Sequence, residues 1–187
     1  MDWSPVPEAE MAVTEAGTRH PAGPGWFIVN VADAAAIESG EFGSAVLFDG
    51  GFLGGHRFAE MGVNIRMLEP GQRSAMYHRE PNQEAFLVLA GECLLIVEDE
   101  QRPLRQWDFV HSPAGTAHVI IGAGTGPCWV LMVGGRTADA PVLYPASDIA
   151  QSHGAGVAAD TADASVAYAN ASPPRPIRLP WPPAAGR

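Results

Sequence analysis

The segment that decides the fold is PGQRSAMYHREPNQE (residues 70–84), which is followed by AFLVLA (residues 85–90) and Gly91. Side chains two positions apart in a β-strand point to the same face of the sheet, so His78 and Glu80 share a face. A Pro-Asn pair then marks a turn, after which Glu84 can return beside them on the neighbouring strand. The segment therefore predicts one imidazole and two carboxylates gathered between two strands.

A second segment, DFVHSPAGTAH (residues 108–118), adds another imidazole to this set. It has the same organisation as the first: a short strand, a Pro-x-Gly turn, and then His118 at the start of the next strand. His111 lies within the first of these strands, where it alternates with Phe109. The two turns thus bring titratable side chains to the ends of strands that are distant in sequence.

Short runs of strand-forming residues extend outward from these two segments. Eight runs are separated by Gly, Pro and acidic turns: residues 26–30, 44–48, 62–68, 84–90, 93–98, 108–112, 118–122 and 128–133. No long helical pattern lies between them, and parallel strands would need such crossover helices. The pattern predicts an all-β antiparallel barrel or sandwich.

These motifs resemble those of the cupin superfamily, whose members are small double-stranded β-helix barrels related to jelly rolls. The first cupin motif ends in a Glu that is followed, after six residues, by a Gly, as Glu84 and Gly91 are here. The second contains Pro-x-Gly, two residues and a His, which here are PAG (residues 113–115) and His118. The resemblance covers about residues 60–135 and implies a jelly-roll-like cupin barrel, to which this chain adds short C-terminal helices and extended tails.

Four features depart from the cupin pattern. Glu80 stands in place of the second His of the first motif, and six residues rather than five separate Gly71 from His78. In the second motif Trp107 stands in place of a Gly, and Gly122 in place of an Asn. These departures leave the fold resemblance intact but leave the register of the first motif open.

Two registers are compatible with the first motif. Counting forward from its first glycine places Tyr77 and Arg79 at the ligand positions, since a slip of one residue turns every side chain to the other face. Counting back from its last glycine places His78 and Glu80 there. We prefer the second register, because Tyr and Arg are poor ligands for a divalent ion, and the first stays an alternative.

In the preferred register the resemblance implies a divalent transition metal, Fe, Mn, Zn or Ni, held by His78, Glu80, Glu84 and His118. If Glu80 lies too far away to bind, the other three form the two-His-one-carboxylate set associated with non-haem Fe(II), and Glu80 becomes a catalytic general base. The alternative is a barrel without metal, in which these groups only hydrogen-bond to one another. One of the two carboxylates would then have to be protonated.

Strand alternation suggests further roles. Phe86 and Val88 share the face of Glu84 and are expected to form the apolar wall of a substrate pocket. His111 is a candidate catalytic residue that carries a proton near the pocket, with a buried structural histidine as the alternative. Candidates for contact with a substrate carboxylate, with solvated strand faces as the alternative, are Asn64, Arg66, Tyr77 and Arg79.

The composition divides the chain into three regions. Residues 1–20 are rich in Ala, Pro and Glu and are expected to form a tail or strap. Residues 21–146 are expected to form the barrel, and residues 147–187 an extension of short helices and a Pro-rich extended segment. Ser147 as an N-cap and Gly154 as a stop predict the first of these helices.

Length and charge limit the function. A chain of 187 residues suits one domain. Its net charge of -10 and the lack of an Arg cluster disfavour nucleic acids and anionic membranes as partners. No apolar run approaches the roughly 20 residues that span a bilayer, and the N-terminus is acidic, so a cytoplasmic location is predicted.

The cupin resemblance also implies a class of activity. It suggests a homodimer that binds or acts on a small oxygen-bearing molecule, by dioxygenase-like oxidation or by isomerisation. The competing interpretation is a non-catalytic module that binds or senses a small molecule. The residues themselves do not choose between these interpretations, because one fold hosts many reactions.

Overall fold

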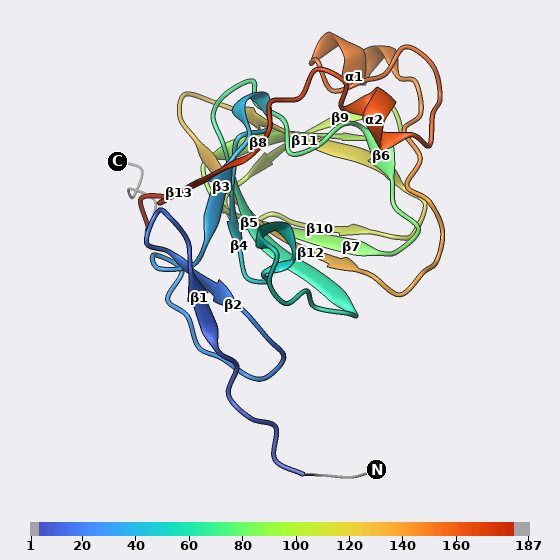
Figure 1. Ribbon diagram of the computed structural model, residues 1–187. Helices are drawn as coiled ribbons and strands as arrows, with labels where there is room; N and C mark the ends of the chain where they lie inside the picture. Colours follow the sequence, from blue (N-terminus) through green and yellow to red (C-terminus); the bar gives the residue numbers. More distant parts are fainter. Residues whose placement is uncertain (1–3, 182–187) are drawn as a thin grey trace.

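The computed structural model describes residues 4–181, in which two antiparallel sheets face each other as a barrel (Figure 1). The larger sheet has the order β10-β7-β12-β5-β4-β3-β13 and is made of β3 (Ala36–Glu38), β4 (Ser44–Leu47), β5 (Met61–Leu68), β7 (Glu84–Ala90), β10 (Phe109–Ser112), β12 (Cys128–Gly135) and β13 (Arg175–Ile177). The smaller sheet has the order β6-β11-β8-β9 and is made of β6 (His78–Arg79), β8 (Glu92–Val97), β9 (Glu100–Arg105) and β11 (Ala117–Ala123).

Short elements complete the fold. They are the hairpin of β1 (Met11–Val13) and β2 (Arg19–Pro21), the 3-10 helices η1 (Gly40–Phe42) and η2 (Gly51–Leu53), and the α-helices α1 (Asp148–Ser152) and α2 (Ala164–Ala167). Helix α1 begins after Ser147, whose side chain accepts a hydrogen bond from the Ala150 amide, as the sequence predicts. The predicted all-β barrel with short C-terminal helices is confirmed. Within residues 4–181, none of the helices has the length and apolar character that a membrane crossing requires.

The main core lies between the two sheets. Alternate residues of β7 enter it, so that Phe86 and Val88 are buried while the residues between them face the other side of the sheet. The core cluster comprises Leu68, Phe86, Val88, Cys93, Leu95, Ile120, Cys128 and Val130. It fills one end of the barrel and leaves the other end to polar side chains.

The C-terminal extension covers both sheets from outside. Strand β13 pairs with β3 at the edge of the larger sheet (Figure 1). Leu179 and Trp181 then pack with Ile65 and Trp129 on the outer face of this sheet. Helix α1 lies over the smaller sheet. These contacts make the extension part of the packed structure.

The pairing of β6 with β11 determines the register of the first motif. His78 lies directly opposite His118, and Arg79 lies opposite Ala117. Tyr77 points the other way and is 2% exposed, because it packs under the C-terminal extension with Ala150 of α1. The register that places His78 in the interior is therefore the one in the structure.

Two departures from the expected motif have a conformational explanation. Trp107, which replaces a Gly, has a φ of 75° and is 67% exposed, so a bulky residue occupies a left-handed position that Gly would adopt more easily. Gly122, which replaces an Asn, lies so close to the Glu69 carbonyl that a Cβ atom would be 2.2 Å from its oxygen. Only Gly fits at position 122.

One expected strand is missing, and one strand that was not expected is present. Residues 26–30 form no strand, and Trp26 makes only an isolated bridge to Glu8. Conversely, the polar segment of β9 pairs with β8 at the edge of the smaller sheet. An edge strand tolerates its proline and its charges because one side needs no backbone partner.

Candidate metal centre and its cavity

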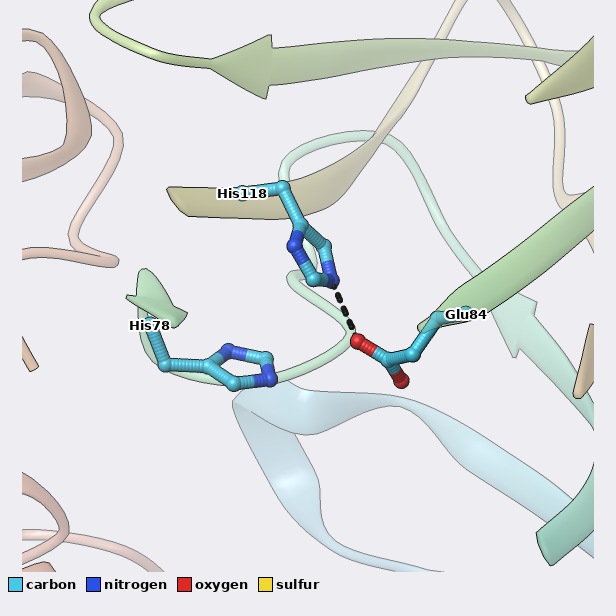
Figure 2. Close-up of side chains that lie close together, drawn as sticks. All are labelled: His78, Glu84 and His118. Carbon is cyan, nitrogen blue, oxygen red and sulfur yellow. Dashed lines mark ion pairs between the residues drawn. The ribbon is translucent and has the colours of Figure 1, made fainter. Parts of the chain in front are cut away.

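Three side chains from three different strands meet inside the barrel (Figure 2). His78 comes from β6, Glu84 from the start of β7 and His118 from β11. Each offers one ligand atom, and these three atoms lie within 4.8 Å of one another. The closest contact joins His118 Nε2 to Glu84 Oε2 at 3.0 Å. This trio is placed so that it could hold a metal ion.

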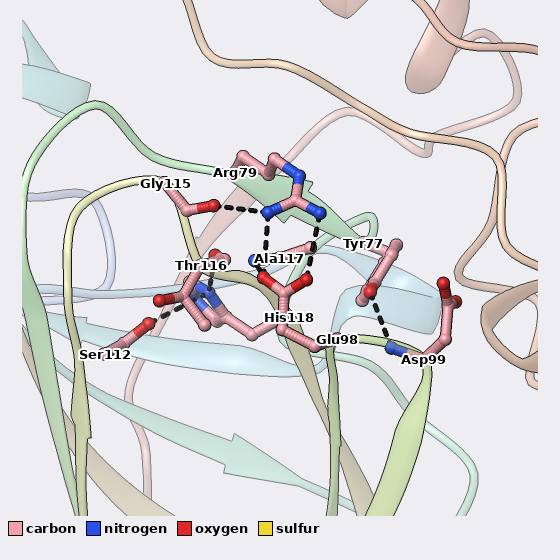
Figure 3. Close-up of polar contacts among 9 residues, drawn as sticks. All are labelled: Tyr77, Arg79, Glu98, Asp99, Ser112, Gly115, Thr116, Ala117 and His118. Atoms are coloured by element: carbon pink, nitrogen blue, oxygen red, sulfur yellow. Dashed lines mark hydrogen bonds and ion pairs between the residues drawn. The ribbon is translucent and has the colours of Figure 1, made fainter.

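Backbone carbonyls orient both imidazoles in the same way. The Nδ1 atom of His78 lies 2.7 Å from the Met76 carbonyl oxygen. The Nδ1 atom of His118 lies 3.0 Å from the Thr116 carbonyl oxygen, as Figure 3 shows. A carbonyl oxygen only accepts, so each Nδ1 carries a proton and donates it. The neutral form of each ring then presents a bare Nε2 as a potential ligand, which is the arrangement that metal-binding histidines require.

This arrangement leaves one carboxylate oxygen without a donor. When His118 carries its proton on Nδ1 alone, the buried Glu84 Oε2 has no hydrogen-bond donor in the described part of the chain. Two lone pairs then face each other across 3.0 Å. A buried acceptor pair of this kind is unfavourable unless a cation lies between or beside the two atoms. Either a proton or a metal ion can supply that positive charge.

The pKa values of the two histidines diverge. Burial lowers the pKa of His118, but the hydrogen bond and the negative charge of Glu84 outweigh burial and raise the pKa above its ordinary value. Burial, together with the positive charge of His118, lowers the pKa of His78 to about 4. Glu84 thus favours the protonated form of His118, while burial keeps His78 neutral at neutral pH.

Glu80 lies beside this trio but outside the cluster of ligand atoms. Its Oε1 atom is 3.6 Å from His78 Nε2. Burial, followed by repulsion from Glu84, raises the pKa of Glu80 above its ordinary value. This geometry fits the second of the two expected roles, a carboxylate that moves a proton next to the three ligands.

An ion pair on the outer side of the smaller sheet fixes the positions of both histidines. Glu98, in the turn between β8 and β9, binds the guanidinium of Arg79 through both carboxylate oxygens and accepts a hydrogen bond from the Ala117 amide at 2.7 Å (Figure 3). Arg79 follows His78, and Ala117 precedes His118. Sequence reasoning missed Glu98 because nothing local links this turn to the two strands.

The trio opens into a cavity of about 540 Å³. Its lining includes His78, Glu80, Glu84, Phe86, His118, Ile120 and Met132, together with Asn64, Arg66 and Arg136. The predicted pocket wall is thus present at Phe86. Val88 lies deeper, in the closed core, and does not line the cavity. Ile120 and Met132 are wall residues that sequence reasoning did not name.

The placement of His111 needs correction. Ser112 is buried and its hydroxyl lies 3.4 Å from His118 Nδ1, so this side of β10 faces the interior. His111 points to the opposite, exposed face with Phe109 and does not line the cavity. The expectation that His111 reaches the pocket assumed that Phe109 marks the inner face.

Of the four candidates for contact with a substrate carboxylate, only some line the cavity. Asn64 and Arg66 of β5 line the cavity. Tyr77 and Arg79 do not, because Tyr77 packs under α1 and Arg79 binds Glu98. Two of the four candidates therefore face the space next to the metal-binding trio.

The chain is similar to a known family and to several solved structures. The family described as the Cupin domain matches residues 64–134, which include Glu84 and His118. A putative sugar phosphate isomerase from Acidithiobacillus ferrooxidans is 33% identical with a TM-score of 0.45, and the match covers 55% of this chain and 64% of that one, less than two thirds of its length. A cupin described as a sugar phosphate isomerase from Silicibacter pomeroyi is 27% identical with a TM-score of 0.44, covering 54% of this chain and 68% of that one.

A third structure shares the fold at low sequence identity. The polyketide cyclase RemF from Streptomyces resistomycificus is 16% identical with a TM-score of 0.50, and the match covers 63% of this chain and 83% of that one. No curated protein matches the chain. The family match over residues 64–134, together with the two facing antiparallel sheets, identifies a cupin domain within this chain.

Proposed function

We propose that the chain is a metal-dependent cupin in which His78, Glu84 and His118 hold one divalent transition metal ion. One observation carries the proposal. Two imidazoles, each oriented by an Nδ1 contact to a backbone carbonyl, accompany a buried carboxylate oxygen that lacks a donor unless a cation is present. The alternative of a purely hydrogen-bonded cluster needs a permanent proton on His118 instead.

The chemistry of the donors narrows the choice of metal. Two imidazoles and one carboxylate suit Fe, Mn, Zn or Ni, and no thiolate takes part. Calcium and magnesium prefer sites built from oxygen ligands alone. A set of two His and one carboxylate is the one associated with non-haem Fe(II), so iron is the first metal to test.

The surrounding residues suit proton transfer on a small molecule. When bound, the ion would supply Lewis-acid polarisation of a substrate oxygen. The pKa of Glu80 is raised toward neutral pH. Glu80 would therefore accept a proton from the substrate and return it. Phe86, Ile120 and Met132 provide apolar walls that limit water around the reacting group. Isomerisation and dioxygenase-like oxidation both fit these parts.

Metal analysis of the purified protein tests the proposal. Protein purified without added metal should contain about one transition metal ion per chain, and His78→Ala and His118→Ala should lose it. His111→Ala is the matched control, because His111 lies on the exposed face of β10. Loss of metal from the control as well, or retention in both site variants, would refute the assignment.

Assays of the metal-loaded protein divide the functional alternatives. Oxygen uptake and isomerisation are followed with small acids, phenols and sugars, and Glu80→Gln should lower any turnover while metal stays bound. Binding of a ligand without turnover would identify a binding or sensing module instead. The homodimer stays a prediction that light scattering can test, and the cytoplasmic location stays a prediction as well.

A further inference from the structure

Arg66 is a partly buried cation without an anionic partner. It lies on β5 and lines the cavity of the metal-binding trio. Its one hydrogen bond in the described part of the chain is a long one, from Nη1 to the Phe42 carbonyl oxygen at 3.4 Å. Within residues 4–181 no carboxylate forms an ion pair with it.

Two other arginines in or near the site have carboxylate partners. Arg136, which lines the same cavity, is paired with Asp49 at 2.6 Å, and Arg79 is paired with Glu98 at 2.8 Å. A guanidinium has five N–H donors, and burial of an unpaired charge is costly. Burial indeed lowers the pKa of Arg66, and the nearby Tyr168 opposes this effect. Such a cost is expected where a ligand supplies the missing charge.

A second polar group on the same face also lacks a partner. Asn64 is two residues before Arg66 on β5, so the two side chains point to the same side of the sheet. The Asn64 Oδ1 atom is buried and has no hydrogen-bond partner in the described chain. The two side chains together offer a guanidinium and an amide to one bound molecule.

Asn64 and Arg66 stand where two cavities meet. Both residues line the cavity of the metal-binding trio and also an adjacent cavity of about 440 Å³. The walls of the second cavity are largely apolar and include Ile37, Phe42, Leu47, Val63 and Tyr168. A molecule anchored at this junction can extend an apolar group into one cavity and an oxygen-bearing group toward the trio.

We propose that Arg66 binds the carboxylate of a small organic acid whose apolar body occupies the second cavity, and that Asn64 Oδ1 accepts a hydrogen bond from a hydroxyl of the same molecule. The inference deepens the proposed function, on which its orientation toward the trio rests. The unpaired guanidinium of Arg66 can balance one negative charge on the bound molecule. The carboxylates of Glu80 and Glu84 line the same space and would repel a phosphate dianion. A bidentate contact between a guanidinium and a carboxylate is the expected binding mode.

Binding of matched probes tests the assignment. Phenyllactate and 3-phenylpropionate are compared by calorimetry with 3-phenylpropionamide and with 2-phenylethyl phosphate, using the full chain with and without metal. We expect at least one acid to bind wild type at least tenfold more tightly than the amide and the phosphate. Equal binding of acids and amide overturns the proposal, and preference for the phosphate overturns the choice of carboxylate.

Variants locate the binding to Arg66. Arg66→Gln should weaken acid binding at least tenfold and Arg66→Lys by less, whereas Arg102→Gln, on exposed β9, should bind as wild type does. Unchanged acid binding by Arg66→Gln refutes the site. Metal content separates the two proposals: wild type that takes up no metal but binds acids through Arg66 refutes only the metal centre, while metal-loaded protein that does not bind acids refutes only this inference.

Stability gives an independent measure that does not depend on the probe. Arg66→Met removes an unpaired, partly buried charge and should raise Tm by roughly 2–4 °C. If Arg66 only supported the fold, Arg66→Met would lower Tm instead. A fall in Tm, with acid binding retained, would therefore identify Arg66 as structural and overturn the proposal.

Discussion

His118 Nε2 and Glu84 Oε2 lie 3.0 Å apart inside the barrel, while the other nitrogen of His118 is committed to the Thr116 carbonyl oxygen. The contact is favourable only when a positive charge is present at it. A proton on Nε2 meets this need in the metal-free protein, and a metal ion would replace that proton. Glu84 raises the pKa of His118 although burial lowers it, because the carboxylate stabilises a positive charge on the imidazole.

The first prediction follows from this exchange. Binding of Zn²⁺ or Fe²⁺ to the metal-free protein near neutral pH should release a proton from His118, so the apparent affinity should fall as the pH is lowered. Calorimetry in buffers of different ionisation enthalpy measures the number of protons released. His78 contributes none at this pH, because its pKa is about 4. Proton-independent binding would contradict the arrangement.

The low pKa of His78 predicts an acid-sensitive fold. Its folded value of about 4 lies below the ordinary 6.5, so the unfolded chain binds the extra proton first as the pH falls. The contribution of His78 is present above pH 6.5 and is lost toward pH 4, with a magnitude of about 3 kcal/mol at most. Urea unfolding of metal-free wild type and of His78→Asn should differ in pH slope across this window; parallel slopes would refute the burial of a neutral imidazole.

Glu84→Gln should separate metal binding from stability. The amide can donate to His118 Nε2, so the metal-free protein should keep its unfolding free energy within about 1 kcal/mol. Metal affinity should fall at least tenfold, because a charged ligand is lost. Equilibrium dialysis and urea unfolding measure the two effects. A variant that binds metal as wild type does would show that Glu84 is not a ligand.

Gly134 should be intolerant of a methyl group because of Glu84. A Cβ atom at Gly134 would lie 3.2 Å from Glu84 Oε1 and 3.3 Å from its Cγ, so Gly134→Ala must displace that carboxylate. Metal affinity should fall several-fold. Gly126→Ala is the matched control, since no atom lies within 4 Å of a Cβ built there. Equal affinities for the two variants would contradict this position of Glu84.

Glu98 should act on the metal centre from outside the cavity. Glu98→Ala removes the partner of Arg79 and of the Ala117 amide, so the ends of β6 and β11 should loosen. We expect a loss of roughly 1 kcal/mol in unfolding free energy, since the pair is partly exposed, and a several-fold loss of metal affinity. Dialysis and urea unfolding test both. Glu100→Ala, on exposed β9, is the control and should leave metal affinity unchanged.

Much of this architecture follows from local patterns, and the remainder depends on contacts distant in sequence. Turn residues and alternation suffice to predict the strands that carry His78, Glu84 and His118. They do not decide which face of a strand is inside when two apolar residues are adjacent, as Phe109 and Val110 are. Phe109 proved to be 65% exposed, and this reversed the expected orientation of His111.

Edge pairing and ion pairs across strands are also invisible to local patterns. The polar strand β9 forms because β8 offers it a free edge, and its own composition does not favour a strand. The ion pair of Glu98 with Arg79 depends on the contact between the β8–β9 turn and β6 in the folded chain, so the local sequence does not reveal it. The absence of an anionic partner for Arg66 likewise appears only when every acidic side chain around it has been placed.

The most direct test of the metal centre is a diffraction experiment on native protein, purified without added metal, at the absorption edges of iron, manganese, nickel and zinc. The account predicts one anomalous peak beside Nε2 of His78 and of His118 and a carboxylate oxygen of Glu84, matched by about one metal ion per chain in elemental analysis. Full-length, folded protein that shows no peak there, and that takes up no stoichiometric metal when any of these four ions is supplied, would contradict it.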